Sequence, residues 1–579
     1  MQTKKLFLMA SWLTVFGVLL ASCAPTAAPT PTPKPAAPAP TKAPAATAAP
    51  KAAATPVAKP TAAPKPAAPS PTPKPSGEQP RYGGILTTDN MSDPPHFDLH
   101  QLTGSSQRRP LRPCFHELVE WDPYPPNTAV VGGLAESWQT SADGMTWTFR
   151  LRKGVKFHNG MPITSEDVKF TIDRMRDPPK GVTSARKGSF GPVSTVECPD
   201  GDTVKLTLKY PQAAFLGILT AAEMSVYSAG AVKSGLDPKR EVVGTGPFKL
   251  KRYNPGISFE LEKNNDYFIR GRPYLDGITF YLIRDIASRF AAFRTGQVRI
   301  TSIGSGGLTP PQADLVRNDM KGQAEAIRYP GTSGRSLQIN VTQPPWTDAR
   351  VRRAVHLAVD RQVGVKVVDE GAATVGGHML ASSEWATPTN ELMKLPGYRQ
   401  PKDADRAEAK KLLAEAGFSD GLEVILSYGT QPYMEKMAEF FTAQLDTIGI
   451  RARPKVTEYS LYLDALRKHN FVIGVLSQAV YFDDPDEALL GYVTGAPRNY
   501  PSFSDKTFDE LYQKQSRTVD PAERKKLVSQ LERILFELVP SVPLWWIDYD
   551  LGIWDYVKNY YPGWGWFVGV RFTDVWLAM

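Results

Sequence analysis

Residues 132–175 constrain the fold most strongly, because they join a strand, turns and a helix within one short segment. From Thr146 to Arg152 apolar and polar side chains alternate, which predicts a half-buried strand. A second short strand is expected at residues 155–157. Thr164 and Asp167 have the spacing of a capping box, which opens a helix. Local physics alone therefore predicts an ordinary surface unit of two strands and a helix.

The N-terminus has the layout of an exported lipoprotein. Lys4 and Lys5 precede an apolar run, residues 6–20, that is too short to span a membrane, so residues 1–22 are expected to be a signal peptide. Residues 20–23, Leu-Ala-Ser-Cys, resemble a bacterial lipobox. Cys23 is then the expected lipidation site, since a thiol is the nucleophile that takes the diacylglyceryl group. The alternative is a chance cysteine after an ordinary signal peptide.

The segment that follows has almost nothing to bury. Residues 24–79 are nearly all Pro, Ala, Thr and Lys, a composition that predicts a disordered, semi-rigid spacer. Cys23 and this spacer, residues 23–80, are therefore expected to tether a folded body to a membrane. An alternative is contact between the lysines of the spacer and an anionic cell-wall polymer.

The positive charge of the chain belongs to its N-terminal part. The formal net charge is +9, and residues 1–80 carry eight lysines and one glutamate, a net +7, which leaves +2 for the rest. The body therefore gives no indication of nucleic-acid binding.

The body, from about residue 81, is too long for one hydrophobic core, so more than one domain is expected. Its two cysteines, Cys114 and Cys198, either pair or remain buried free thiols, and the sequence leaves both options open. Its apolar runs are broken by charge or proline, so no second transmembrane segment is expected.

Several segments, taken in order, resemble one family. LAESW, DG-T-TF-LR-GVKFH-G and T-EDV-F, all within residues 132–175, resemble family 5 of the bacterial extracellular solute-binding proteins, which supply ABC importers with peptides or nickel. Residues 244–250 resemble the GTGP segment of that family, and residues 336–341 resemble its L-x-x-N strand. A helix is expected after that strand, with Thr347 as its N-cap. Residues 520–523, Asp-Pro-Ala-Glu, predict the start of another helix.

The resemblance implies an α/β fold, a two-lobe clamshell with mixed sheets and an extra subdomain inserted in lobe one. The chain is expected to cross to lobe two near Tyr329 and to return near Trp545, and these crossings would form the hinge. The expected boundaries are 81–120, 121–235 (the extra subdomain) and 236–328 for lobe one, 329–545 for lobe two, and 546–579 for the return to lobe one.

The resemblance also implies the function. The chain is expected to be a monomeric carrier, not an enzyme, that closes on a ligand and delivers it to an ABC permease with its ATPase. No cofactor is implied. A peptide-like or other oligomeric organic solute is the expected ligand, and an oligosaccharide or a metal complex is the alternative.

Residues 478–486 are the expected ligand segment, and they depart from the family. Peptide-binding relatives have a pattern resembling W-x-x-D-x-x-DPD, whose first Asp meets the amino terminus of the peptide. Here Asp484-Pro-Asp486 matches the last part, but Tyr481 replaces that Asp and Gln478 replaces the Trp. Asp483 is a substitute if the loop shifts by two residues. The alternative for the three aspartates is a solvated loop.

Aromatic residues supply further candidates. Six of the twelve tryptophans lie between Trp545 and Trp576. Trp545 and Trp546 are at the predicted return crossing, so at least one is expected to face the cleft and to stack on ligand. Arg335 and Asn340 lie on the predicted strand after the first crossing. Arg335 is a candidate partner for an anionic ligand group, with a surface ion pair as the alternative.

Two other classes of protein find little support. An exported enzyme is not favoured, because the chain has no Gly-x-Ser-x-Gly elbow, no His-Glu-x-x-His and no P-loop. No metal ligands are assigned, since the seven histidines are scattered and His96 and His100 fall in a predicted loop. A structural adhesin would explain the spacer but not the ordered body.

Overall fold

The computed structural model describes residues 78–101, 104–124, 129–302, 307–563 and 571–579. The predicted signal peptide, Cys23 and nearly all of the spacer lie outside these residues.

The first sheet has four strands in the order β1-β10-β9-β8. β1 and β10 run parallel, and the other neighbours run antiparallel, so the sheet is mixed. Its strands are β1 (Ile85–Asn90), β8 (Phe248–Asn254), β9 (Ser258–Lys263) and β10 (Gly277–Leu282).

The second sheet has six strands in the order β12-β16-β11-β15-β13-β14. The pairs from β12 to β15 are antiparallel, whereas β13 pairs in parallel with both β15 and β14. Its strands are β11 (Ala324–Ile339), β12 (Ala373–Val375), β13 (Leu422–Gly429), β14 (Ile450–Thr457), β15 (Ile473–Ala479) and β16 (Ser541–Trp554).

The third sheet contains the segment that the sequence singles out. It is antiparallel, in the order β4-β5-β7-β6, with strands β4 (Ala135–Thr140), β5 (Thr146–Leu151), β6 (Val193–Asp200) and β7 (Thr203–Leu208). The predicted strand at 146–152 is confirmed as β5. The one expected at residues 155–157 is wrong: Lys156 forms only an isolated bridge to Pro162. Left-handed turns at Gly154 and Gly160 leave too few extended residues between them.

The remaining elements are two small strand pairs and the helices. The pairs are β2 (Val119–Trp121) with β3 (Val130–Gly132), and β17 (Val557–Lys558) with β18 (Trp576–Leu577). The helices in the first half are α1 (Ser105–Leu111), η1 (Arg112–Cys114), α2 (Ser165–Arg176), η2 (Lys187–Phe190), α3 (Phe215–Ile218), η3 (Ala222–Met224), α4 (Ala229–Lys233), α5 (Ile286–Arg294) and α6 (Pro310–Asp319). Those in the second half are α7 (Ala349–Ala358), α8 (Arg361–Val368), α9 (Thr389–Leu392), α10 (Asp403–Glu415), α11 (Pro432–Asp446), α12 (Tyr459–Arg467), α13 (Pro485–Leu489), η5 (Leu490–Tyr492), α14 (Lys506–Arg517) and α15 (Pro521–Leu538).

Helix starts follow the predicted capping chemistry closely. The Asp167 carboxylate accepts a 2.8 Å hydrogen bond from the Thr164 backbone N–H, and the two form the capping box of α2. Asp520 caps α15 by accepting the N–H of Glu523 at 2.8 Å. The prediction of Thr347 as the cap of α7 is wrong by one residue. Asp348 caps that helix, because its carboxylate accepts the N–H of Arg350.

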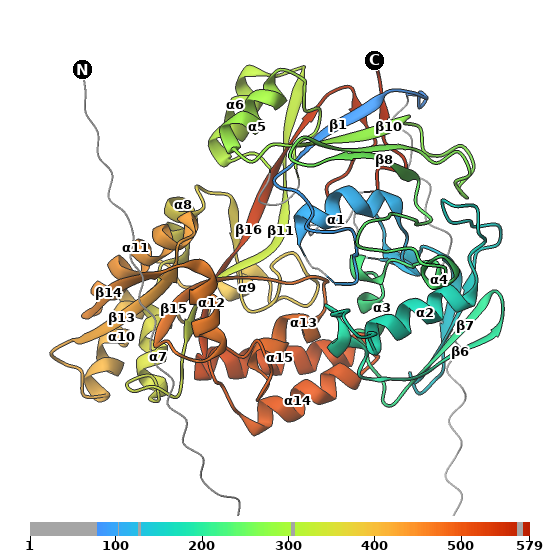
Figure 1. The fold of residues 1–579 in the computed structure, drawn as a ribbon. Helices are drawn as coiled ribbons and strands as arrows, with labels where there is room; N and C mark the ends of the chain where they lie inside the picture. The colour runs from blue at the N-terminus through green and yellow to red at the C-terminus, as the bar shows by residue number, and fades with distance from the viewer. Residues whose placement is uncertain (1–77, 102–103, 125–128, 303–306, 564–570) are drawn as a thin grey trace, which may run out of the picture. The chain divides into compact units, whose positions relative to one another are not determined.

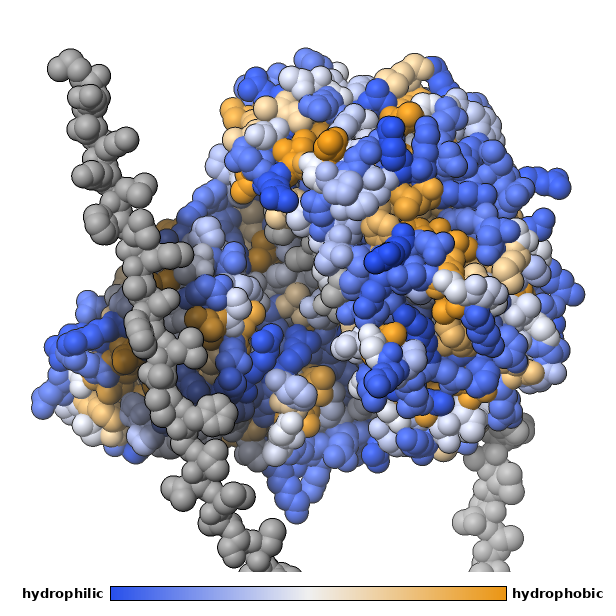
Figure 2. All heavy atoms as spheres, viewed as in Figure 1, coloured by the Kyte–Doolittle hydropathy of each residue, from blue (hydrophilic) through white to orange (hydrophobic). Residues whose placement is uncertain are grey.

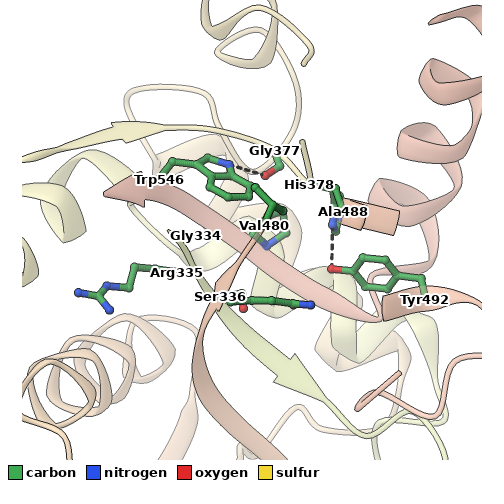
Figure 3. Close-up of a pocket in the computed structure, with 11 residues that line it drawn as sticks. Gly334, Arg335, Ser336, Gly377, His378, Val480, Ala488, Tyr492 and Trp546 are labelled. Carbon is green, nitrogen blue, oxygen red and sulfur yellow. Dashed lines mark hydrogen bonds between the residues drawn. The ribbon is translucent and has the colours of Figure 1, made fainter. Parts of the chain in front are cut away.

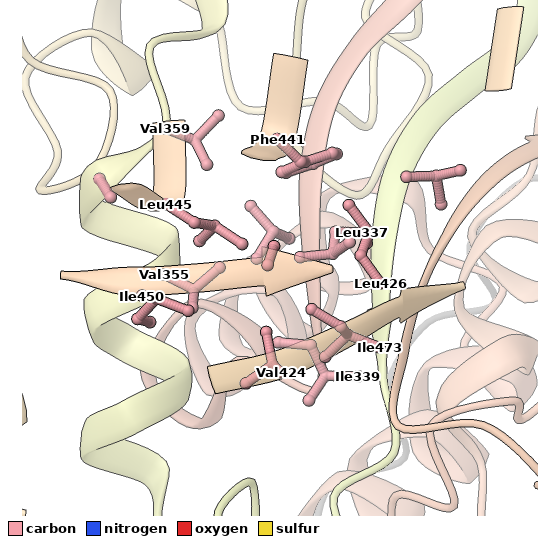
Figure 4. Close-up of a cluster of buried hydrophobic side chains, with 14 of the residues drawn as sticks. Leu337, Ile339, Val355, Val359, Val424, Leu426, Phe441, Leu445, Ile450 and Ile473 are labelled. Atoms are coloured by element: carbon pink, nitrogen blue, oxygen red, sulfur yellow. The ribbon is translucent and has the colours of Figure 1, made fainter. Parts of the chain in front are cut away.

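Strands β11 and β16 run side by side (Figure 1) and contribute residues to two hydrophobic cores. They pair along their length, from Ala324 opposite Trp554 to Gln338 opposite Ser541. Tyr329 packs in the core beneath the first sheet. Leu337, further along β11, packs in the core of the second sheet, where helices α7 and α11 cover strands β13 and β15 (Figure 4). The change of core thus occurs within single strands, with a register shift between Pro330 and Gly334.

The two cysteines of the body are free thiols, Cys114 buried and Cys198 partly exposed. The pairing option is therefore wrong, and of the two free thiols only Cys114 is buried as the alternative expected. Hydrophilic residues cover most of the face in Figure 2, where hydrophobic residues form separate patches.

Within the described ranges, no helix combines the length and the apolar character needed to cross a membrane.

Candidate functional site

A cavity lies where β11, β15 and β16 meet, in the second sheet. Its volume is about 40 Å³, which is room for a few water molecules or one small ligand group. Figure 3 shows how side chains from distant segments converge on it. The lining residues are Gly334, Arg335, Ser336, Gly377, His378, Gln478, Val480, Ala488, Tyr492, Pro543 and Trp546.

Trp546 forms an apolar wall of the cavity and is 7% exposed. Its indole N–H donates to the Gly377 carbonyl oxygen at 3.3 Å, which fixes the ring against the loop after β12 (Figure 3). The neighbouring Gly376 must lack a side chain, because a Cβ there would lie 2.6 Å from Trp546 Cδ1. The tryptophan and this glycine pair therefore shape one side of the cavity together.

A buried polar chain forms another wall. The Nδ1 atom of His378 lies 3.0 Å from the Tyr492 hydroxyl, which in turn lies 2.7 Å from the Ser541 hydroxyl. Burial lowers the pKa of His378 to about 3 and raises the pKa of Tyr492 to about 12. Both side chains are therefore uncharged at neutral pH.

Arg335 borders the cavity, but its guanidinium forms an ion pair with Asp369. Its guanidinium donates to both carboxylate oxygens of Asp369, at 2.7 and 3.2 Å, and lies 3.9 Å from the ring centre of Tyr433. Figure 3 shows it turned away from Trp546 and His378. The side chain supplies one edge of the cavity and no free positive charge.

Two other sequence candidates are buried away from the cavity. Trp545 is 1% exposed, packs against Phe440, and donates its indole N–H to Asp369 at 2.6 Å. Asn340 is fully buried and donates to the carbonyl oxygens of His469 and Phe471. In this structure both side chains hold the second core together, and of the predicted tryptophan pair only Trp546 lines the cavity.

The three aspartates beyond β15 have different environments. Asp484 caps α13 and accepts two hydrogen bonds from Arg524, at 2.6 and 2.7 Å. Asp486 is 9% exposed and accepts from Gln515 and Ser516, at 2.5 and 2.7 Å. These two carboxylates therefore tie α13 to α14 and α15.

Asp483 differs from both neighbours, because no arginine of the described residues forms an ion pair with it, whereas Arg524 pairs with Asp484 and Asp486. Burial is the main cause that raises its pKa to about 6, and repulsion by Asp484 and Glu384 adds to it. A ligand ammonium group beside this carboxyl would stabilise its ionised form.

Tyr481, at the position where the family pattern has aspartate, faces two arginines. Its ring centre lies 5.4 Å from the Arg108 guanidinium carbon and 4.8 Å from that of Arg186. Arg108 belongs to α1 and forms a buried ion pair with Glu223. Tyr481 thus joins the segment after β15 to parts of the chain around the first and third sheets.

Comparison with known proteins decides the family. Residues 129–500, well over half of the chain, match "Bacterial extracellular solute-binding proteins, family 5 Middle". The chain belongs to family 5 of the bacterial extracellular solute-binding proteins. The resemblance carried by residues 132–175 is thereby confirmed.

Known members of the family resemble this family 5 protein over most of its length. Heme-binding protein A of Haemophilus influenzae is 27% identical over 76% of this chain and 83% of its own. Di/tripeptide-binding protein 1 of Pseudomonas aeruginosa is 29% identical over 78% of this chain and 87% of its own. The solved structure of the periplasmic binding protein DppA from Helicobacter pylori, in complex with the peptide STSA, is 25% identical, with a TM-score of 0.70 over 86% of this chain and 99% of that one.

These likenesses confirm the predicted fold class and the general function. The fold is the α/β fold of periplasmic binding proteins, and the protein is an extracytoplasmic solute-binding protein of the ABC-importer class. Its family and its structural neighbours are substrate-binding proteins rather than enzymes.

Sequence reasoning missed part of the cavity in this family 5 protein. His378 and Tyr492 lie 114 residues apart in the chain, and neither belongs to a motif that the sequence singles out. The one local signal is Gly376-Gly377, directly before His378 and soon after β12, since paired glycines permit close approach of another ring. Of the predicted site residues, Arg335 and Trp546 line the cavity.

Proposed function

We propose that this solute-binding protein captures a peptide-like or other oligomeric organic solute and passes it to a membrane permease. The cavity beside Trp546 carries this proposal. It offers an aromatic wall and hydrogen-bonding groups sized for one part of a larger ligand, which is how an extended solute is held segment by segment. The relatives that bind di- and tripeptides, or the peptide STSA, favour the same class of ligand.

Asp483 is proposed as the partner of a ligand ammonium group. It follows the strand that lines the cavity, and the two aspartates after it are held by Arg524 or by α14. A charge-assisted bond from an ammonium to this carboxylate would act in a partly dry environment and would orient the ligand.

The ligand is proposed to act by closing two lobes around a hinge in β11 and β16, near Tyr329 and Trp545. The change of hydrophobic core between Tyr329 and Leu337, with a register shift between Pro330 and Gly334, supports a hinge in this part of the two strands. Ligand favours closure through its higher affinity for the closed form, and roughly 5 kcal/mol of difference moves a population from mostly open to mostly closed.

The protein is proposed to be lipid-anchored at Cys23, with residues 23–80 as the tether. The Leu-Ala-Ser-Cys sequence after an apolar run supports this proposal. Two or more acyl chains hold a protein stably on a membrane, where a single chain gives marginal binding. The tether then keeps a monomeric carrier at high effective concentration beside its permease and ATPase.

The test is to identify what the cavity holds. Mass spectrometry of material that co-purifies with the protein, followed by calorimetry with the compound found, should reveal a peptide or a similar oligomeric solute. Peptide, oligosaccharide and metal libraries in a thermal-shift screen provide the comparison. If peptides give no shift and another class does, the proposed ligand class is wrong. Turnover of a bound compound would overturn the carrier function itself.

A further inference from the structure

The imidazole of His378 is buried at the cavity and has one ring nitrogen without a hydrogen bond from the described residues. It is 6% exposed and lines the cavity, and Tyr492 occupies its Nδ1 atom. Among the residues that the structure describes, none gives its Nε2 atom a hydrogen bond. An unpaired buried polar atom is unfavourable, so a ligand group that bonds to Nε2 would be stabilised at this point.

The side chains that line the cavity carry no available charge. Burial keeps His378 and Tyr492 neutral, since it lowers the pKa of the first and raises that of the second. Arg335 is neutralised by Asp369. Glu532 lies behind Gly377 and outside the lining, where its carboxyl accepts a hydrogen bond from the Thr387 hydroxyl at 2.8 Å and burial raises its pKa. A charged ligand group would therefore lose its hydration without gaining a counter-ion.

The other walls suit a small group with both polar and apolar surfaces. Trp546, Val480 and Pro543 are apolar, whereas Gln478 brings an amide that can donate and accept. The Tyr492 hydroxyl bridges Nδ1 of His378 and the Ser541 hydroxyl, an arrangement compatible with either tautomer of the imidazole. Nε2 is then either a donor or an acceptor, and a carboxamide or a hydroxyl satisfies it in both cases.

We infer that the cavity is a subsite for an uncharged hydrogen-bonding group of the solute, a carboxamide or a hydroxyl, and that it excludes carboxylates and ammonium groups. This inference rests on the proposed capture of a peptide-like solute, and it specifies which side chains such a solute presents to the second sheet. Trp546 covers the apolar part of the group, and His378 and Gln478 bond its polar end.

The first experiment probes the cavity directly. Protein labelled with ¹⁵N-histidine is titrated with acetamide, acetate or methylammonium, and the His378 resonance is assigned by its loss in His378→Phe. Acetamide should shift the Nε2 signal, while acetate and methylammonium at equal concentration should leave it in place. A shift with either ion that matches the acetamide shift, or no shift with acetamide, overturns the inference.

The second experiment uses calorimetry with tripeptides that carry Gln, Glu, Lys or Leu at each position in turn on an alanine background. At one position Gln should bind about tenfold more tightly than the other three, because one hydrogen bond to a neutral group contributes about that factor. His378→Phe should remove the preference, and His378→Gln, which keeps a hydrogen-bonding group, should retain part of it. If His378→Phe does not fold, Tyr492→Phe serves in its place, because it frees Nδ1 and should weaken the same preference.

The two experiments separate the two ideas. If tripeptides bind without a Gln preference at any position, the subsite is wrong and the proposed function stands. If no tripeptide binds but acetamide shifts His378, the proposed ligand class fails and the chemistry of the cavity stands.

Discussion

Replacing Asp483 by asparagine should stabilise the protein and at the same time weaken the binding of an amine ligand. The pKa of Asp483 rises from an ordinary value of 3.8 to about 6, chiefly through burial. At about 1.4 kcal/mol per pKa unit, the ionised carboxylate destabilises the folded protein by about 3 kcal/mol at most. The side chain is partly exposed, so screening by solvent reduces this figure to about 1–2 kcal/mol.

The sign of the pH dependence follows from the direction of the shift. A carboxyl group whose pKa is raised in the folded state costs stability once the pH exceeds its unfolded value, and the full cost applies above the folded value. The advantage of Asp483→Asn should therefore be largest at pH 7 and should shrink as the pH falls from 6 toward 3.8. Urea unfolding followed by tryptophan fluorescence at several pH values measures it.

Asp483→Asn should weaken amine binding, although it stabilises the folded protein. Calorimetry with a tripeptide and with its N-acetylated form should show that Asp483→Asn weakens only the free amine, by about 10- to 100-fold, the range of a charge-assisted hydrogen bond. The wild-type affinity for the amine should also fall as the pH drops through about 6, because the carboxyl must first lose its proton.

Asp484→Asn is the matched control. It breaks a bidentate pair with the buried Arg524 and should lower the free energy of unfolding by about 1–3 kcal/mol. A variant Asp483→Asn that is less stable than wild type at pH 7, or that binds the free amine as well as wild type does, would refute the assignment of Asp483.

The remaining predictions concern the other candidate residues. Trp545→Ala should lower the free energy of unfolding by about 3–5 kcal/mol, since that ring is fully buried, and a small loss measured by urea unfolding would contradict its place in the core. Trp546→Ala should instead reduce ligand affinity in calorimetry, and unchanged affinity would remove it from the site. Tyr481→Ala should favour the open form by about 1–2 kcal/mol, because it removes two cation–π contacts; small-angle scattering without ligand should then show a larger radius of gyration. Cys23→Ser should move the protein from the membrane to the soluble fraction, and continued attachment would argue against the lipobox.

Local chemistry explains which parts of the fold could be predicted. The caps at Thr164 and Asp520 act over three residues, so their spacing was sufficient to place two helices. Where two capping residues stand side by side, as at Thr347 and Asp348, spacing could not choose between them. The expected strand at 155–157 failed for a related reason: alternation over three residues is too short to outweigh the flanking turns.

The candidate site was predictable only in part. Trp546 and Arg335 were found through their expected place on strands near the crossings, and the structure puts both at the cavity. His378 and Tyr492 come from a loop and a short helix that lie far apart in the chain, and they meet only because the second sheet brings those segments together.

The sequence by itself determined the family, the general function and most of the local elements, since these depend on short segments that keep their order along the chain. Only the tertiary structure decided which polar groups are free to meet a ligand. Asp483 and Asp484 are neighbours of one type, yet Asp484 is bound by Arg524, 40 residues further on, and Asp483 is not. The fold makes that choice by placing Arg524 of α15 beside the start of α13, because an ion pair forms where folding brings the side chains together, whatever their separation in the chain.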